Sequence, residues 1–322
     1  MTTIGKRQKM RLNQIKIAHL TTPNNVFLAP LAGYTNAVFR NMCRVLGAGL
    51  TFTEMVSAKG LCYDSKKTED LLYVTEDYSG IKACQIFGAD PVYMRRACES
   101  EALKPFDLID INMGCPVPKI YKNGEGSALL NDLPLASKII SECKKSGKII
   151  SVKFRIGVDK TQYVSAEFAK MCQDSGADMI TVHGRTRDKM YSGEVNFGEI
   201  AAAKNAVKIP VIANGGIFTP ADADELMEKT GTDGVMVARG AMFNPWLFAE
   251  ITGTPVGDKR QQVLEQIVRT REIMGERFAC VFMRKMVGFY IKGTNGATAL
   301  RAKLLECKTT NEVAEIVGTL SF

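Results

Sequence analysis

The chain has 322 residues, of which 46% are hydrophobic and 24% are charged, and its formal net charge is +8. This is the composition of an ordinary globular protein, and the length suits one large α/β domain with a small addition. No apolar run is long enough to cross a bilayer, so we expect no membrane-spanning segment and no membrane partner.

The cysteines, the histidines and the N-terminal residues further limit the class of protein to which the chain can belong. Residues 1–20 carry five Lys/Arg and no acidic residue, but they lack the apolar segment of a signal peptide. The nine cysteines include no Cys-x-x-Cys pair, and histidine occurs only as His19 and His183. We therefore expect reduced thiols, a cytoplasmic location and no metal site.

Short apolar segments, each closed by glycine or polar residues, alternate with segments of helical periodicity. The predicted strands are 26–33, 50–56, 81–87, 106–111, 149–156, 178–182, 210–213 and 234–238. One predicted helix begins after a cap at Thr35-Asn36. Further helices are predicted over 91–103, 135–143, 163–172, 197–206 and 221–229. Eight strands separated mostly by helices predict a closed (β/α)8 TIM barrel. An open doubly wound sheet is the alternative, although no Gly-x-Gly-x-x-Gly follows the first strand.

The two ends of the chain differ from the predicted barrel. Residues 12–17 alternate between apolar and polar, which predicts one strand of a hairpin at the barrel bottom. Beyond Trp246, helical spacing in 261–274, 278–290 and 297–305 predicts a small helical domain. We therefore divide the chain into a basic segment (1–20), a barrel (21–245) and a helical domain (246–322). Positive charge at both ends favours a polyanionic partner, although two solvated faces would explain it as well.

The stretch 110–119 places a thiol at the end of a predicted strand. The apolar run 106–111 ends in Gly114-Cys115-Pro116, as a buried parallel strand does where it opens onto a loop. Prolines, lysines and glycines follow as far as Gly126, and we expect a loop there that is neither helix nor strand. Cysteine is often a small buried hydrophobe, but its Gly and Pro neighbours favour a functional thiol here.

The other strand ends also carry residues that are unusual in a core. They are Pro30 to Gly33, Gln85, Asn112, Lys153 with Arg155, His183 with Arg185, Asn214-Gly215-Gly216 and Ala238-Arg239-Gly240. Because barrel chemistry gathers at the carboxyl ends of the strands, these residues form the candidate site. Lys153 would face either a bound anion or electron-rich ring, or an acidic side chain, and the sequence leaves both open. The last two strand ends lie where such barrels hold a phosphate.

These stretches resemble the tRNA-dihydrouridine synthase family, whose members use FMN to reduce uridine in tRNA. The matching segments are 29–33, 85–88, 110–119, 122–124, 126–130, 152–155, 183–187, 214–216 and 238–246. The resemblance implies that FMN is lined by Pro30, Leu31, Ala32, Gln85, Lys153, Asn214, Gly215, Gly216, Ala238 and Arg239, with His183 beside it. It also implies that NADPH or NADH is the reductant, that the flavin delivers hydride and that Cys115 is the general acid. A thiol with a pKa of about 8.5 is mostly protonated at neutral pH and suits this role.

The resemblance also indicates which residues would bind the RNA substrate. A uridine in folded RNA must be flipped out to reach a barrel mouth. The expected substrate residues are Asn112, Arg155, Arg185, Arg187, Arg284, Lys285 and Lys292, the last three in the helical tRNA-binding domain. Two alternatives remain: a barrel oxidoreductase that acts on a free pyrimidine, like a dihydroorotate dehydrogenase, and a non-enzymatic RNA-binding protein.

Overall fold

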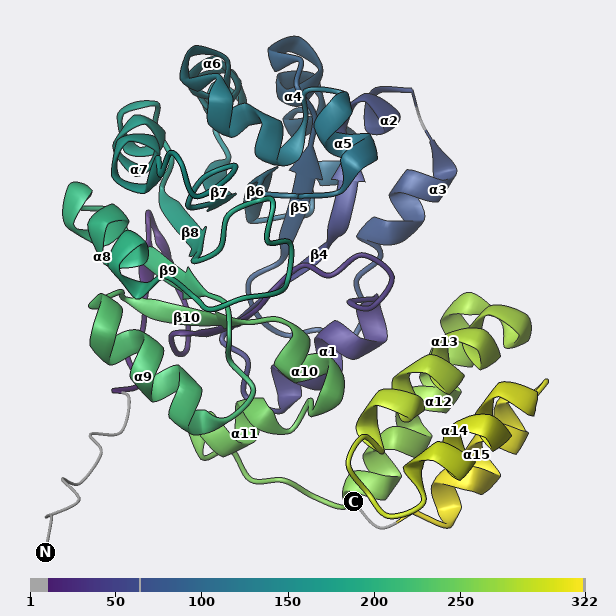
Figure 1. Cartoon of the computed structure of the whole chain (residues 1–322). Coiled ribbons are helices and arrows are strands. Elements are labelled where there is room, and N and C mark those ends of the chain that lie inside the picture. The colour runs from purple at the N-terminus through teal and green to yellow at the C-terminus, as the bar shows by residue number, and fades with distance from the viewer. Residues whose placement is uncertain (1–10, 64, 321–322) are drawn as a thin grey trace, which may run out of the picture.

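The computed structural model describes residues 11–63 and 65–320, and in this part of the chain eight parallel strands close into a barrel (Figure 1). The strands are β3 (Val26–Leu28), β4 (Leu50–Ser57), β5 (Ala83–Phe87), β6 (Leu108–Met113), β7 (Ile149–Arg155), β8 (Met179–His183), β9 (Val211–Asn214) and β10 (Gly234–Val237). Since β10 pairs with both β9 and β3, the predicted TIM barrel is confirmed and the open sheet is wrong. Lys6, Arg7 and Lys9 of the predicted basic segment lie outside the described residues.

Alternate residues of each strand point into the barrel, and the residues between them point toward the surrounding helices. The inner cluster consists of Phe27, Ala29, Leu50, Phe52, Ala83, Leu108, Ile149, Met179, Ile212 and Met236, together with Ile15 and Ile17. The outward-facing strand residues belong to a larger cluster shared with the helices. Because both faces of every strand are buried, the strands read in the sequence as nearly continuous apolar runs.

A two-stranded antiparallel hairpin covers the barrel at the end where its strands begin. It consists of β1 (Lys16–Ile17) and β2 (Leu20–Thr21), and its Ile15 side chain lies beside Gly234 at the start of β10. The strand predicted over 12–17 is formed only at its last two residues. The chain turns there at Ala18, whose φ is 51°.

Helices surround the barrel, and side-chain caps fix where several of them start. They are α1 (Ala37–Val45), α2 (Ala58–Cys62), α3 (Lys66–Glu69), α4 (Pro91–Cys98), α6 (Leu133–Lys144), α7 (Ser165–Asp174), α8 (Phe197–Ala206) and α9 (Pro220–Thr230), with 3-10 turns at Asp70–Leu72 and Glu101–Leu103. The Asn36 side chain caps α1, and Thr219 forms a capping box with Asp222 on α9. The helix predicted over 91–103 is interrupted, because α4 ends at Cys98 and a 3-10 turn follows.

The segment after Cys115 corrects the sequence analysis, which expected neither helix nor strand there. It contains α5 (Pro118–Lys122) and a 3-10 helix, Gly126–Asn131. Pro118 stands in the first turn of α5, where a missing N–H costs nothing and the fixed φ of proline favours the helix. Pro118 therefore starts a helix at this point.

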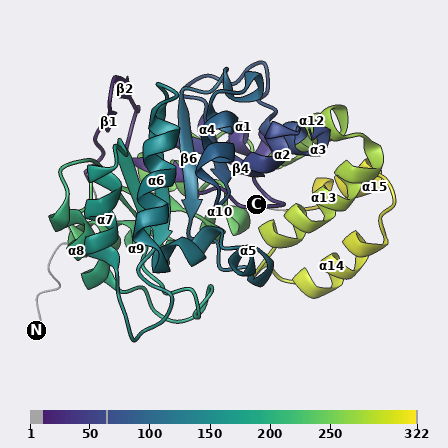
Figure 2. The ribbon, with the colours of Figure 1, turned by 90° about the horizontal axis from the view of Figure 1, so that it is seen from above.

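The C-terminal part is helical and packs beside the barrel mouth (Figures 1 and 2). After α10 (Arg239–Phe243) and α11 (Leu247–Thr252) come α12 (Lys259–Met274), α13 (Glu276–Tyr290), α14 (Ala297–Glu306) and α15 (Thr310–Gly318). The sequence analysis missed α10, α11 and α15, although the Thr309–Glu312 capping box marks the start of α15. Phe289 on α13 meets Phe243 on α10, with ring centroids 5.3 Å apart. None of the helices in the described ranges is long and apolar enough to span a membrane.

Candidate active site

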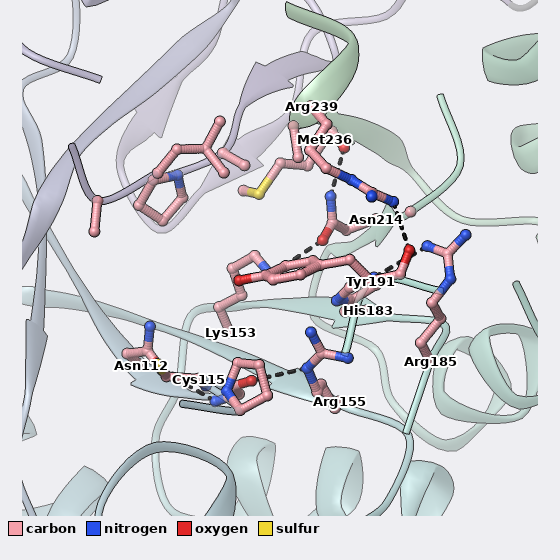
Figure 3. Close-up of a pocket in the computed structure, with 18 of the residues that line it drawn as sticks. Asn112, Cys115, Lys153, Arg155, His183, Arg185, Tyr191, Asn214, Met236 and Arg239 are labelled. Atoms are coloured by element: carbon pink, nitrogen blue, oxygen red, sulfur yellow. Dashed lines mark hydrogen bonds between the residues drawn. The ribbon is translucent and has the colours of Figure 1, made fainter. Parts of the chain in front are cut away.

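A cavity of about 470 Å³ opens at the carboxyl ends of the strands (Figure 3). Every residue predicted to bind the cofactor lines it: Pro30, Leu31, Ala32, Gln85, Lys153, His183, Asn214, Gly215, Gly216, Ala238 and Arg239. Cys115, Asn112, Arg155 and Arg185 line it as well. Its size is that of a typical small-molecule site.

The strand pattern explains why polar groups gather at this end. The inward-facing residues of β7 are Ile149, Ser151, Lys153 and Arg155, in the order from barrel bottom to mouth. They change from apolar to polar and then to cationic along one strand, and β6 changes from the apolar Leu108 to the polar Asp110 and Asn112. Since parallel strands all end at one face, these polar groups meet above a closed apolar floor.

Cys115 is held in the cavity wall by hydrogen bonds to its main chain. Its N–H donates to Asn112 Oδ1 at 2.9 Å, and its carbonyl accepts from Ser127 Oγ at 2.8 Å. Arg155 Nε also donates to the Gly114 carbonyl at 2.9 Å, which fixes the preceding residue. Burial raises the pKa of the Cys115 thiol, so this group is protonated at neutral pH. A positioned S–H that faces a cavity can act as a proton donor.

Gly126 makes the close approach behind Cys115 possible. Its φ is +61°, and a Cβ at this position would lie 2.9 Å from the Cys115 carbonyl oxygen and 3.0 Å from the Cys115 Cβ. We expect Gly126→Ala to shift the thiol and to lower kcat by about tenfold to hundredfold, because small misplacements of a reacting group are costly. Gly124→Ala is the matched control, since φ is +77° there and the nearest atom is 3.9 Å away. Equal kcat values in the two variants would contradict this prediction.

Four cationic side chains, Lys153, Arg155, Arg185 and Arg239, line the cavity, and none of its lining residues is acidic. Burial lowers the pKa of Lys153 to about 8 and that of Arg155 to about 10, and the two charges also repel each other. Lys153 Nζ donates to Asn214 Oδ1 at 3.1 Å and makes no ion pair within the described ranges. Asp110 attracts the ammonium but is not at ion-pair distance, so the geometry favours a bound anion or electron-rich ring over an acidic partner.

The turn after β9 is suited to hold an anionic group. Gly215 and Gly216 have φ values of +125° and +76°. A Cβ on Gly215 would lie 3.1 Å from the His183 ring and 3.3 Å from Arg185 Nη1, so only glycine leaves this space open. Main-chain N–H groups and the Arg239 guanidinium are the donors that a phosphate requires. The cavity also has apolar walls at Met55, Met236 and Met242, so its donors and walls suit a ring that carries a phosphate, as a flavin nucleotide does.

His183 is neutral in this setting. Burial lowers its pKa well below the usual value, and the surrounding cations Arg155, Lys153, Arg185 and Arg239 lower it further. Arg185 Nη1 lies 3.4 Å from His183 Nε2. Because a guanidinium can only donate, Nε2 must accept this bond and the ring proton belongs on Nδ1.

Tyr191 is a cavity residue that the sequence analysis missed. It lies in the loop between β8 and α8, and its ring extends into the cavity (Figure 3). Arg239 Nη2 donates to the Tyr191 carbonyl at 2.8 Å, and the guanidinium carbons of Arg239 and Arg155 lie 5.3 and 5.7 Å from its ring centroid. The sequence shows an aromatic residue shortly after a strand end, which is a signal for a site residue. It does not show that the loop turns inward, because that path depends on these arginine contacts.

Four of the predicted substrate residues lie outside the cavity. Arg187 stacks on Tyr121 at 3.8 Å, and Arg284 Nη1 donates to the Leu305 and Cys307 carbonyls at 2.9 Å each. Lys285 donates to the Gly33 carbonyl and joins the helical domain to the barrel. Lys292 is exposed, with its ammonium 4.2 Å from the Phe243 ring centroid. In residues 11–63 and 65–320, no group of His, Cys, Asp and Glu could hold a metal ion.

The fold and the site define a (β/α)8 barrel protein with a cationic cavity and a thiol at its carboxyl mouth. A model of the dihydrouridine synthase (Dus) family matches residues 27–320. A tRNA-dihydrouridine synthase B from Pseudomonas aeruginosa is 35% identical over 312 residues, covering 93% of each chain. A relative with the same description from Shewanella oneidensis is 36% identical over 279 residues, covering 83% of this chain and 86% of the relative. The chain therefore belongs to the dihydrouridine synthase family and is an enzyme.

Solved structures of low sequence identity share the barrel. A morphinone reductase mutant in complex with tetrahydroNAD matches with a TM-score of 0.56 at 11% identity, covering 75% of this chain and 90% of that chain. Histamine dehydrogenase from Rhizobium sp. 4-9 matches with a TM-score of 0.57 at 13% identity, covering 81% of this chain and 50% of that chain. These likenesses agree with the TIM barrel fold.

Proposed function

We propose that this enzyme reduces the C5=C6 bond of uridines in tRNA to 5,6-dihydrouridine, with FMN as cofactor and NADPH or NADH as electron source. The observation that carries the proposal is the Cys115 thiol, whose pKa is raised by burial, on the wall of a cavity lined by four cations and no acid. Such a cavity suits a phosphorylated cofactor, and the thiol suits a proton donor.

When bound, FMN would supply the hydride equivalent that C6 of the uracil ring receives. The turn at Gly215 and Gly216, with Arg239, would hold the phosphate, while Lys153 and Gln85 would face the flavin ring and neutral His183 would lie beside it. Cys115 would donate its proton to C5, and the thiolate would recover a proton from water. C5 and C6 thus each gain one hydrogen.

The remaining residues would orient the substrate. Asn112 Nδ2 donates to Gln85 Oε1 at 2.8 Å and to Met55 Sδ at 3.5 Å, and the edge of the flipped base would replace the weak sulfur acceptor. Arg155 and Arg185 would carry positive charge at the mouth, and Arg187 would extend this charge toward α5. The helical domain would contact the phosphate backbone of the tRNA through Arg284, Lys285 and Lys292.

The test is a single-turnover reaction on an unmodified tRNA transcript with the purified, FMN-loaded protein and NADPH or NADH. Mass analysis of the digested RNA should show a uridine that has gained two hydrogens. Free uracil, uridine and orotate serve as competing substrates in parallel reactions. Reduction of a free pyrimidine but not of tRNA would overturn the proposal in favour of the small-substrate alternative.

Lys292 provides a prediction for tRNA binding. It is exposed beside the mouth, so a phosphate contact would release counterions. We expect Lys292→Ala to weaken tRNA binding and to reduce the slope of log K against log salt by about 0.7–0.9. The matched control is Lys208→Ala, an exposed lysine that precedes β9 at the barrel bottom. Identical salt slopes for the two variants would place the RNA elsewhere.

A further inference from the structure

Asp110 is a buried carboxylate to which the proposed chemistry gives no role. It faces the barrel interior from β6 and is 1% exposed. Its Oδ1 accepts from Ser151 Oγ and its Oδ2 from Gln85 Nε2, both at 2.6 Å. Among the described residues it has no partner at ion-pair distance, but the Lys153 ammonium on β7 attracts it. Burial raises the pKa of Asp110 to about 6, so it is largely ionised at neutral pH. The nearby Lys153 ammonium offsets part of the cost of burying this charge, and the two hydrogen bonds to Ser151 and Gln85 satisfy the carboxylate oxygens.

The ionised carboxylate fixes the orientation of the Gln85 amide, which in turn fixes that of the Asn112 amide. A carboxylate can only accept, so Gln85 must direct its NH2 group at Asp110. Gln85 Oε1 then faces Asn112 and accepts from its Nδ2 at 2.8 Å. This leaves Asn112 Oδ1 to accept from the N–H groups of Gly114 at 3.1 Å and Cys115 at 2.9 Å. Asp110, Gln85, Asn112 and the Cys115 N–H thus form one hydrogen-bonded row. If either amide were flipped, hydrogen-bond donors would face donors along this row.

We propose that Asp110 is a positioning residue that sets the place of the Cys115 thiol through Gln85 and Asn112. The inference rests on the proposed function for its catalytic consequence. The same row fixes which amide hydrogens of Gln85 and Asn112 point into the cavity. Asp110 therefore also determines the donor pattern that meets the bound rings, although it touches neither of them. On the other side of the loop, the Gly114 and Cys115 carbonyls keep their bonds to Arg155 and Ser127.

The experiment compares Asp110→Leu with Asp110→Asn and Ser151→Ala in the full-length, FMN-loaded protein. One readout is the rate at which iodoacetamide alkylates Cys115, followed by mass analysis of its peptide; the others are kcat and KM for tRNA. For Asp110→Leu we expect faster alkylation and a kcat lower by about tenfold to hundredfold, with KM nearly unchanged. Asp110→Asn and Ser151→Ala each keep an acceptor for Gln85 Nε2, so both should remain within about threefold of wild type.

Two results would overturn the proposal. One is a folded Asp110→Leu protein with wild-type alkylation and kcat, and the other is a Ser151→Ala protein as impaired as Asp110→Leu. If the wild type does not reduce tRNA at all, the proposed function fails, and the alkylation rates still decide the role of Asp110.

A double variant keeps the test decisive if Asp110→Leu does not fold. Gln85→Glu places two carboxylates side by side and should disturb the row. Adding Asp110→Asn gives Glu a new amide donor and leaves its other oxygen to accept from Asn112. We expect the Cys115 alkylation rate to return to within about threefold of wild type in the double variant only. Equal rates in Gln85→Glu and the double variant would refute the proposed row.

Discussion

Cys115→Ala is expected to abolish dihydrouridine formation while FMN binding and flavin reduction by NADPH or NADH continue. General acid catalysis contributes about 10²–10⁴-fold, and the lining residues include no acidic side chain that could replace the thiol. The substitution removes one sulfur atom, and the Cys115 N–H and carbonyl bonds do not depend on it. The flavin absorbance would report binding and reduction, and mass analysis of the tRNA would report product.

The matched control for this variant is Cys62→Ala. Cys62 is a half-buried cysteine on α2, outside the cavity, so its removal should leave product formation unchanged. Cys115→Ser separates acidity from shape, because a hydroxyl is a far weaker acid than a thiol and should also fail. Product formation by Cys115→Ala at the wild-type rate would show that another group donates the proton.

The sequence was sufficient to predict the barrel because its signals are local and repeat eight times. Each strand is an apolar run closed by Gly or polar residues, and each strand end falls at the same face. The sequence alone therefore places Gln85, Cys115, Lys153 and His183 at one site, and all four line the cavity. The periodicity alone did not give the strand bounds, and the strand predicted over 26–33 ends at Leu28.

The parts that could not be predicted depend on contacts between distant segments. The sequence shows the charge of Arg284, but only the fold shows that its guanidinium is bonded to carbonyls at the end of α14. Tyr191 reaches the cavity because Arg239, 48 residues further on, holds its carbonyl. Asp110 was part of a matched segment, yet its role requires knowing that Gln85 and Ser151 lie on the neighbouring strands.

Lys153→Met is expected to make the FMN-free protein more stable at pH 7 and to weaken FMN binding by at least about tenfold. Burial, assisted by the charge of Arg155, lowers the pKa of Lys153 from 10.5 to about 8 in the folded protein. The unfolded chain therefore binds more protons between these two values, and the free energy of unfolding should rise with pH from about 8 to 10.5. Below pH 8 the ammonium is charged in both states, and its desolvation cost, partly offset by the attraction of Asp110, opposes folding.

Removing the ammonium should therefore raise the free energy of unfolding at pH 7 by on the order of 1–3 kcal/mol. Methionine has a similar length and fills the same space without a charge. The variant should also lose part of the rise in stability between pH 8 and 10.5. Urea unfolding of the FMN-free proteins at several pH values checks the stability, and flavin fluorescence titration checks the affinity. Lys208→Met, at the exposed barrel bottom, should change neither. A Lys153→Met protein that binds FMN as tightly as wild type would show that the buried ammonium does not face the bound flavin, and the cost of burying it would need another explanation.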